Sequence, residues 1–147
     1  MISERDFRGA VEEMIRLAET KLPADVVAAL KRSMEREESP IARKQLELML
    51  ENLEVAESEN VPICQDTGIL IFFVERGIDL DLNFDMTSAI HRAVQDVTRS
   101  LPLRSNVVDP VSRTDTGDNT GDGQPVVHTE LVPGEELKLA LLVKGAG

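Results

Sequence analysis

The sequence is poor in aromatic residues and has a single cysteine. Its 147 residues include four phenylalanines but no tryptophan and no tyrosine, so the core must be built mainly from aliphatic side chains. One cysteine excludes an internal disulfide, and this favours a cytoplasmic location. The start of the chain resembles no signal peptide, and no apolar run approaches the roughly 20 residues that a membrane-spanning helix needs.

Basic residues are also in the minority. Lys and Arg number 16 against 27 Asp and Glu, which gives a formal net charge of −11 at pH 7. Nucleic-acid binding requires clustered Lys and Arg, so the charge argues against a nucleic-acid partner. It would also repel a small anion, and an anionic substrate would therefore need a local cation. No glycine-rich nucleotide-binding motif is present.

Three amphipathic helices are predicted before residue 60. Ser3 caps the first, with Asp6 at the capping-box position. Pro23 opens the second, and Ser39 with Pro40 opens a third that runs to about residue 57. Their apolar stripes are interpreted as core: Phe7, Ala10, Val11, Met14, Leu17 and Ala18 in the first helix, Val26, Val27, Leu30 and Met34 in the second, and Ala42, Leu46, Met49, Leu50 and Leu53 in the third.

The pattern changes to strands after residue 60. Residues 69–74 form an uninterrupted apolar run that predicts a strand buried on both faces, ended by Gly77. Asp85 caps a fourth helix, and residues 100–125 form a long polar loop. Residues 126–131 and 137–143 are predicted to pair as strands around a turn at Pro133 and Gly134.

The predicted fold is therefore α+β. We expect one domain over residues 1–147, with a helical layer (1–59) packed on a small mixed sheet with one further helix. Residues 60–147 hold the strands and loops that would carry a site.

Two short motifs in the polar segments suggest other functions. Asp-Thr-Gly occurs at residues 66–68 and 115–117, as in aspartic proteases, but no apolar strand adjoins the second copy and the leading helices fit that class poorly. A calcium loop starting at Asp118 would need a glutamate at its twelfth position, where Thr129 stands. A turn-rich solvated loop is the better interpretation.

Cys64 lies in a loop at the mouth of the apolar strand. With His128 it could form a nucleophile pair, although a lone cysteine is more often a small buried residue. Its neighbours Gln65 and Asp66 could meet a ligand, and Gly68 permits close approach of the backbone. A thiolate here could bind metal, but iron–sulfur clusters take several cysteines and this chain has one.

Four blocks of the sequence together resemble one family. Residues 62–68 (Pro-Ile-Cys-Gln-Asp-Thr-Gly), 103–106 (Leu-Arg-Ser-Asn), 118–120 (Asp-Asn-Thr) with 128–130 (His-Thr-Glu), and 144–147 (Lys-Gly-Ala-Gly) strongly resemble the class I fumarase and L-tartrate dehydratase family. Their order and spacing are similar to those of its alpha subunit or amino-terminal half. The resemblance covers essentially the whole chain.

This resemblance implies a [4Fe–4S] cluster held by three cysteines, of which Cys64 matches the first. Gln65, Asp66 and Arg104 match positions that contact a dicarboxylate, Gly147 matches a backbone contact, and Asp66 is the candidate catalytic residue. Arg104 would supply the cation that the acidic chain needs, and His128 could support the site from outside.

The resemblance further implies a reversible hydro-lyase for fumarate and malate, or for tartrate. The other two cysteines and the usual catalytic base would belong to a carboxy-terminal remainder or a beta subunit, so this chain would be inactive alone. The alternative is a non-catalytic binding or assembly protein that kept the fold without a cluster.

Overall fold

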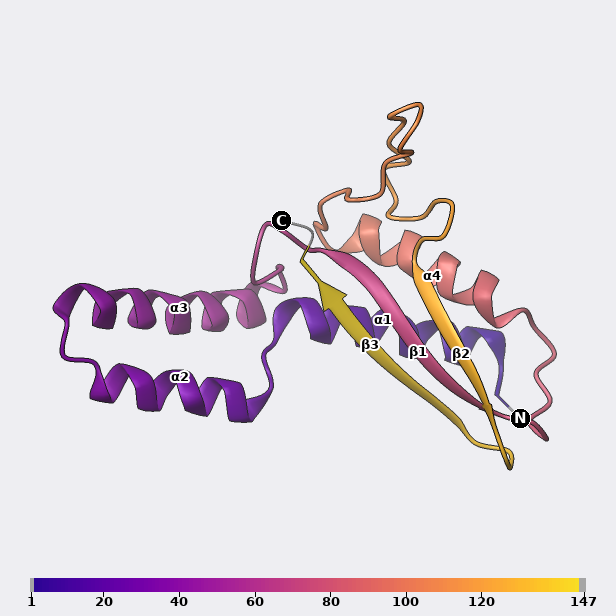
Figure 1. Ribbon diagram of the computed structural model, residues 1–147, viewed down its shortest axis with the longest axis horizontal. Helices are drawn as coiled ribbons and strands as arrows, with labels where there is room; N and C mark the ends of the chain where they lie inside the picture. The colour runs from indigo at the N-terminus through magenta and orange to yellow at the C-terminus, as the bar shows by residue number, and fades with distance from the viewer. Residues whose placement is uncertain (1, 146–147) are drawn as a thin grey trace.

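The computed structural model describes residues 2–145 and shows an α+β fold, as predicted. Figure 1 shows a twisted sheet with two helices behind it and a pair of helices that extends away from it. The elements are α1 (Glu4–Thr20), α2 (Ala24–Arg36), α3 (Pro40–Glu59), β1 (Ile69–Gly77), α4 (Met86–Ser100), β2 (Val126–Val132) and β3 (Leu137–Lys144). No helix in the described part is long and apolar enough to cross a membrane.

The predicted helix starts are confirmed by their caps. The Ser3 hydroxyl accepts a hydrogen bond from the Asp6 amide at 3.1 Å, and Ser39 accepts one from the Ala42 amide at 3.4 Å. Asp85 accepts from the Ser88 amide at 2.5 Å. Each side chain satisfies a backbone donor that the first turn of a helix leaves unpaired.

The predicted pairing of the last two strands is wrong. The strand order is β2-β1-β3, with β1 parallel to β2 and antiparallel to β3. The connection between β2 and β3 passes around the end of β1, where the Gly77 amide donates to the Glu136 carbonyl at 2.7 Å. A Cβ atom on Gly77 would collide with the Gly134 carbonyl, so glycine lets the turn close around the central strand.

Helices α1 and α4 cover one face of the sheet and enclose the core. The core is aliphatic, as the composition required, with Phe7 and Phe72 as its only buried aromatics among the described residues. In α1 the buried face runs through Phe7, Val11 and Ile15, whereas Leu17 is 38% exposed. The apolar stripe predicted for α1 therefore lies partly on the exposed side of the helix, and it omits the buried Ile15.

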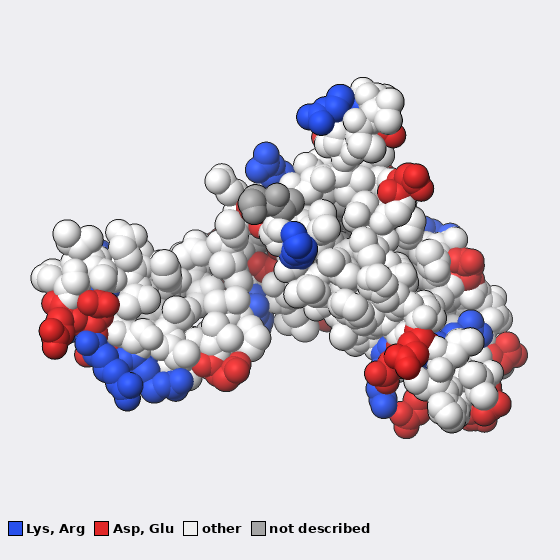
Figure 2. Space-filling model, viewed as in Figure 1, with Lys and Arg blue, Asp and Glu red and all other residues white. Residues whose placement is uncertain are grey.

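The opposite face of the sheet is open. Leu70, Phe72 and Val74 of β1 are buried under the helices, but Phe73 is 45% exposed. The prediction that this strand is buried on both faces is wrong, because no described element covers the second face. Figure 2, which looks onto that face, shows that its centre is largely uncharged.

Of the three leading helices, only α1 packs on the sheet. Helices α2 and α3 contact each other and project from the body (Figure 1). No residue of α2 is buried, and the one buried residue of α3, Ala56, is not part of the predicted stripe. The predicted core role of both stripes is therefore wrong. The site is built at the point where this helical pair joins the sheet.

Candidate functional site

The Cys64 loop, defined as residues 61–68, connects α3 to β1 and is held by two helices. The Ile63 amide donates to the Glu19 carbonyl of α1 at 2.9 Å, and the Asn52 side-chain amide of α3 donates to the Ile63 carbonyl at 2.8 Å. Beyond these anchors the side chains of Cys64 and Gln65 are exposed. The loop therefore presents a thiol on a backbone fixed from both sides.

The two Asp-Thr-Gly triplets form the same local turn. In each, the aspartate carboxylate accepts from the glycine amide two residues on, at 3.1 Å for Asp66 and 2.8 Å for Asp115. Both glycines have positive φ, 63° at Gly68 and 74° at Gly117. Aspartate commonly makes this turn and glycine tolerates its left-handed backbone, so turn chemistry explains the repeat without a protease.

The end of β3 lies against the Cys64 loop. A Cβ atom on Gly68 would meet the backbone of Lys144, and one on Gly145 would lie 3.4 Å from Oδ2 of Asp66. The first and last of the four sequence blocks are thus neighbours. Gly147, the predicted backbone contact, lies outside the described residues.

Arg104 follows α4 and is joined to the same loop through its backbone. Its amide donates to the Thr67 hydroxyl at 3.1 Å, and that hydroxyl donates back to the Arg104 carbonyl at 3.4 Å. Thr67 is buried, whereas the Arg104 side chain is exposed and has no ion-pair partner within residues 2–145. The guanidinium is thereby available to an outside anion.

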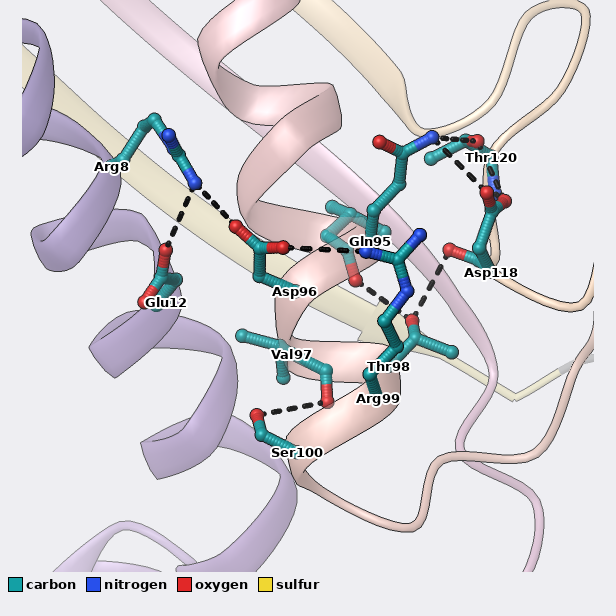
Figure 3. A network of polar contacts seen from close by, with 11 residues as sticks. Arg8, Glu12, Gln95, Asp96, Val97, Thr98, Arg99, Ser100, Asp118 and Thr120 are labelled. Atoms are coloured by element: carbon teal, nitrogen blue, oxygen red, sulfur yellow. Dashed lines mark hydrogen bonds and ion pairs between the residues drawn. The ribbon is translucent and has the colours of Figure 1, made fainter.

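Helix α4 anchors the polar loop of residues 106–124. Gln95 donates to Asp118 Oδ2 at 3.1 Å and to the Thr120 hydroxyl at 3.2 Å. Thr98 donates to the Asp118 carbonyl at 3.2 Å (Figure 3). The carboxylate of Asp118 also accepts from the Thr120 amide and hydroxyl, and these bonds contribute to a lowered pKa of Asp118 against the opposing effect of burial. The hydrogen bonds of Asp118 therefore stabilise the polar loop of residues 106–124.

The structure brings together most of the predicted site. Cys64, Gln65 and Asp66 share one loop, the backbone of Arg104 is bonded to it, and residues 144–145 adjoin it. His128 lies on the open face of the sheet, where its ring stacks on Phe73 with centroids 5.3 Å apart. Its supporting role stays a prediction, as do the roles of the other site residues.

Glu19 is a residue that the sequence analysis missed. It lies in the last turn of α1 and is 6% exposed, and its Oε1 atom has no hydrogen-bond partner among the described residues. Burial and, after it, the negative charge of Asp66 raise the pKa of Glu19 to about 7. The helical pattern of a glutamate-rich segment gives no sign of such a position.

A hollow of about 490 Å³ lies beside the site, lined by Ile69, Asn106 and residues of the polar loop. The charged residues in its lining are Asp109 and Asp122, and no lining residue is basic. A dicarboxylate would be repelled there. The exposed Arg104 is a better anion contact.

This chain can supply one cysteine ligand to a metal cluster. Cys64 is exposed and can reach a group beyond the surface, which fits a single ligand of a shared cluster. Within residues 2–145 no group of three His, Cys, Asp or Glu side chains is placed to hold a metal ion. The remaining ligands of a cluster would have to come from elsewhere.

Comparisons with known proteins find one family model and several named relatives. The sequence model of the family described as fumarate hydratase (Fumerase) matches residues 8–147. An L(+)-tartrate dehydratase subunit alpha of Escherichia coli is 33% identical over 155 residues, covering all of this chain and 51% of that protein. A putative L(+)-tartrate dehydratase subunit alpha of Methanocaldococcus jannaschii is 34% identical over 141 residues, covering 93% of this chain and 50% of that protein. The chain spans about half the length of these curated relatives.

Proposed function

Since the chain belongs to the fumarate hydratase family, we propose that it is the amino-terminal part of a [4Fe–4S]-dependent hydro-lyase. The reaction is the reversible hydration of a small dicarboxylate, fumarate to malate, or the dehydration of tartrate. The observation that carries the proposal is the convergence of residues 62–68, 103–106 and 144–145 at one place on the surface. The relatives named as tartrate dehydratase alpha subunits support the same reaction class.

The proposal assigns a role to each of five predicted site residues. Cys64 binds the cluster, which supplies a Lewis acid for a substrate oxygen. Arg104 binds a substrate carboxylate through its planar guanidinium, which can form two parallel hydrogen bonds. Gln65 and the backbone at Gly147 contact the substrate, and Asp66 orients it or transfers a proton.

The proposal requires a second part of the enzyme. The chain offers one cysteine, whereas the cluster takes three, so the others come from a carboxy-terminal remainder or a beta subunit. Two observations support such a partner: the relatives are named subunit alpha, and the chain spans half their length. The chain alone is therefore expected to be inactive.

The test is anaerobic reconstitution of this chain with its missing portion, in the presence of iron and sulfide. We expect cluster absorbance and malate or tartrate dehydration only in the combined sample, and loss of both after Cys64→Ala. Ser33→Ala, an equally small change on the exposed surface of α2, is the matched control and should retain both. If neither sample takes up a cluster while both components are folded, the binding-protein alternative replaces the enzyme.

A further inference from the structure

The backbone of Arg104 is held by a buried carboxamide. Asn119 is 7% exposed, and its φ of 58° is a left-handed conformation that few non-glycine residues adopt. Its side-chain nitrogen donates to the Arg104 carbonyl at 3.1 Å and to the Thr98 hydroxyl of α4 at 3.2 Å. Asn119 therefore connects the segment that carries Arg104 to a rigid helix.

The same carboxamide is connected to the Cys64 loop through Asn106. The Asn106 amide donates to Asn119 Oδ1 at 2.8 Å, and the Asn106 side chain donates to the Gly68 carbonyl at 2.8 Å and to Thr67 Oγ1 at 3.3 Å. The Thr67 hydroxyl, which also accepts from the Arg104 amide and donates to its carbonyl, then has its one donor and two acceptor sites in use. Removing one member leaves buried polar groups without partners.

We propose that Asn119 is a positioning residue that sets Arg104 at a fixed place relative to the Cys64 loop. The inference rests on the proposed function, in which Arg104 binds a substrate carboxylate beside Cys64. Binding groups on loops act well only when surrounding hydrogen bonds fix their geometry. Asn119 provides this by bonding the backbone of Arg104, so the exposed guanidinium stays available to the substrate.

The test is a double-mutant cycle in the complete enzyme, with Asn119→Gly and Arg104→Ala. Glycine accepts a φ of 58° without strain, so the substitution removes the carboxamide and little else. We expect Asn119→Gly to raise the KM for malate about 10-fold, since a misplaced binding group loses affinity. In the Arg104→Ala background the same change should raise KM by less than about 2-fold, because the two residues act as one unit.

Gln95→Ala is the matched control. Gln95 fastens the same loop to the same helix through Asp118 and Thr120 but makes no described contact with Arg104 or with residues 61–68. It should lower stability while changing KM by less than about 2-fold, as expected for a site that shares no partner with Arg104. When Arg104→Ala itself raises KM, an equal rise of KM after Asn119→Gly in both backgrounds, or no rise in either, would overturn the proposal.

If Asn119→Gly does not assemble, Asn119→Asp enters the same cycle, since it retains the acceptor for the Asn106 amide. Failure of both variants to assemble while Gln95→Ala assembles would also overturn the proposal. The carboxamide would then be needed for folding as such.

Amide hydrogen exchange provides a readout that does not depend on activity. Asn119→Gly should lower the protection of residues 103–106 and 61–68 in the complete enzyme, and Gln95→Ala should not. Lost protection in a complex that has no hydratase activity, or in which Arg104→Ala leaves KM unchanged, would count against the proposed function and leave the positioning role of Asn119 standing. Unchanged protection in Asn119→Gly would overturn the positioning role whatever the activity.

Discussion

At the scale of single residues, the surroundings of Glu19 disfavour the ionised form of its carboxyl group. Its carboxyl is buried, the negative charge of Asp66 is close, and the carboxy-terminal end of α1 adds a partial negative charge. The first two effects raise its pKa from 4.5 to about 7. Glu19 therefore holds a proton at pH values where an exposed glutamate has lost it.

We predict that Glu19→Gln removes a pH dependence of stability. The raised pKa means that the folded chain keeps a proton which the unfolded chain loses above about pH 4.5. The associated stability is complete below pH 4.5 and is lost as pH rises through about 7, by at most about 3 kcal/mol. Glutamine carries no titrating proton.

The free energy of urea unfolding, measured between pH 5 and pH 8 for wild type and variant, checks this prediction. This window lies above the range in which Asp109, Asp115 and Asp118, whose pKa values are lowered, would act in the opposite direction. A slope with pH that persists unchanged in Glu19→Gln would contradict it.

At the scale of elements, the glycines of α1 and β1 have different surroundings. Gly9 lies within α1, and a Cβ atom there would meet open space. Gly77 ends β1 where the turn after β2 crosses it, and a Cβ atom there would collide with the Gly134 carbonyl. The same chemical change should therefore shift stability in opposite directions.

We predict that Gly9→Ala raises the free energy of unfolding by about 0.5–1 kcal/mol, because alanine loses less conformational entropy in a helix. Gly77→Ala should lower it by about 1–3 kcal/mol, because the backbone must shift to admit a methyl group. Each variant serves as the control for the other in chemical denaturation. Destabilisation by both would show that Gly9 has a role that the open space around it does not indicate.

At the scale of the whole molecule, stability is concentrated in the body formed by α1, α4 and the sheet. The buried side chains of β1 and α4 lie there, whereas α2 buries none. The projecting α2–α3 pair carries exposed apolar side chains such as Ile41 at 77% and Met49 at 52%. Segments with few buried contacts open at low free energy.

We therefore expect native-state hydrogen exchange to proceed in two stages. Amides of α2 should exchange at free energies well below global unfolding, and those of Phe72, Val74 and Val94 only at global unfolding. Mass spectrometry of peptides from both regions of the chain measures the difference. Equal protection of α2 and β1 in the isolated chain would contradict it.

By itself, the sequence determined the elements and indicated the loops of the candidate site. Caps at Ser3, Ser39 and Asp85 and the apolar periodicities are local signals, so they placed the helices and strands close to their observed bounds. The order of the four blocks was enough to indicate the family. The sequence also showed both Asp-Thr-Gly triplets, as a motif found in aspartic proteases and not as two copies of one turn.

Only the tertiary structure decided how these pieces meet. It inserted β1 between β2 and β3, buried Ile15 in place of Leu17, and left Phe73 open. It also placed Glu19 near Asp66 and joined Asn119 to Arg104. The physical reason is the distance along the sequence over which each effect acts. Propensity and periodicity act within one or two turns of the chain, whereas burial, pKa and hydrogen-bond partners depend on residues far apart in sequence. Arg104 and Asn119 are 15 positions apart, and Glu19 and Asp66 are 47 apart.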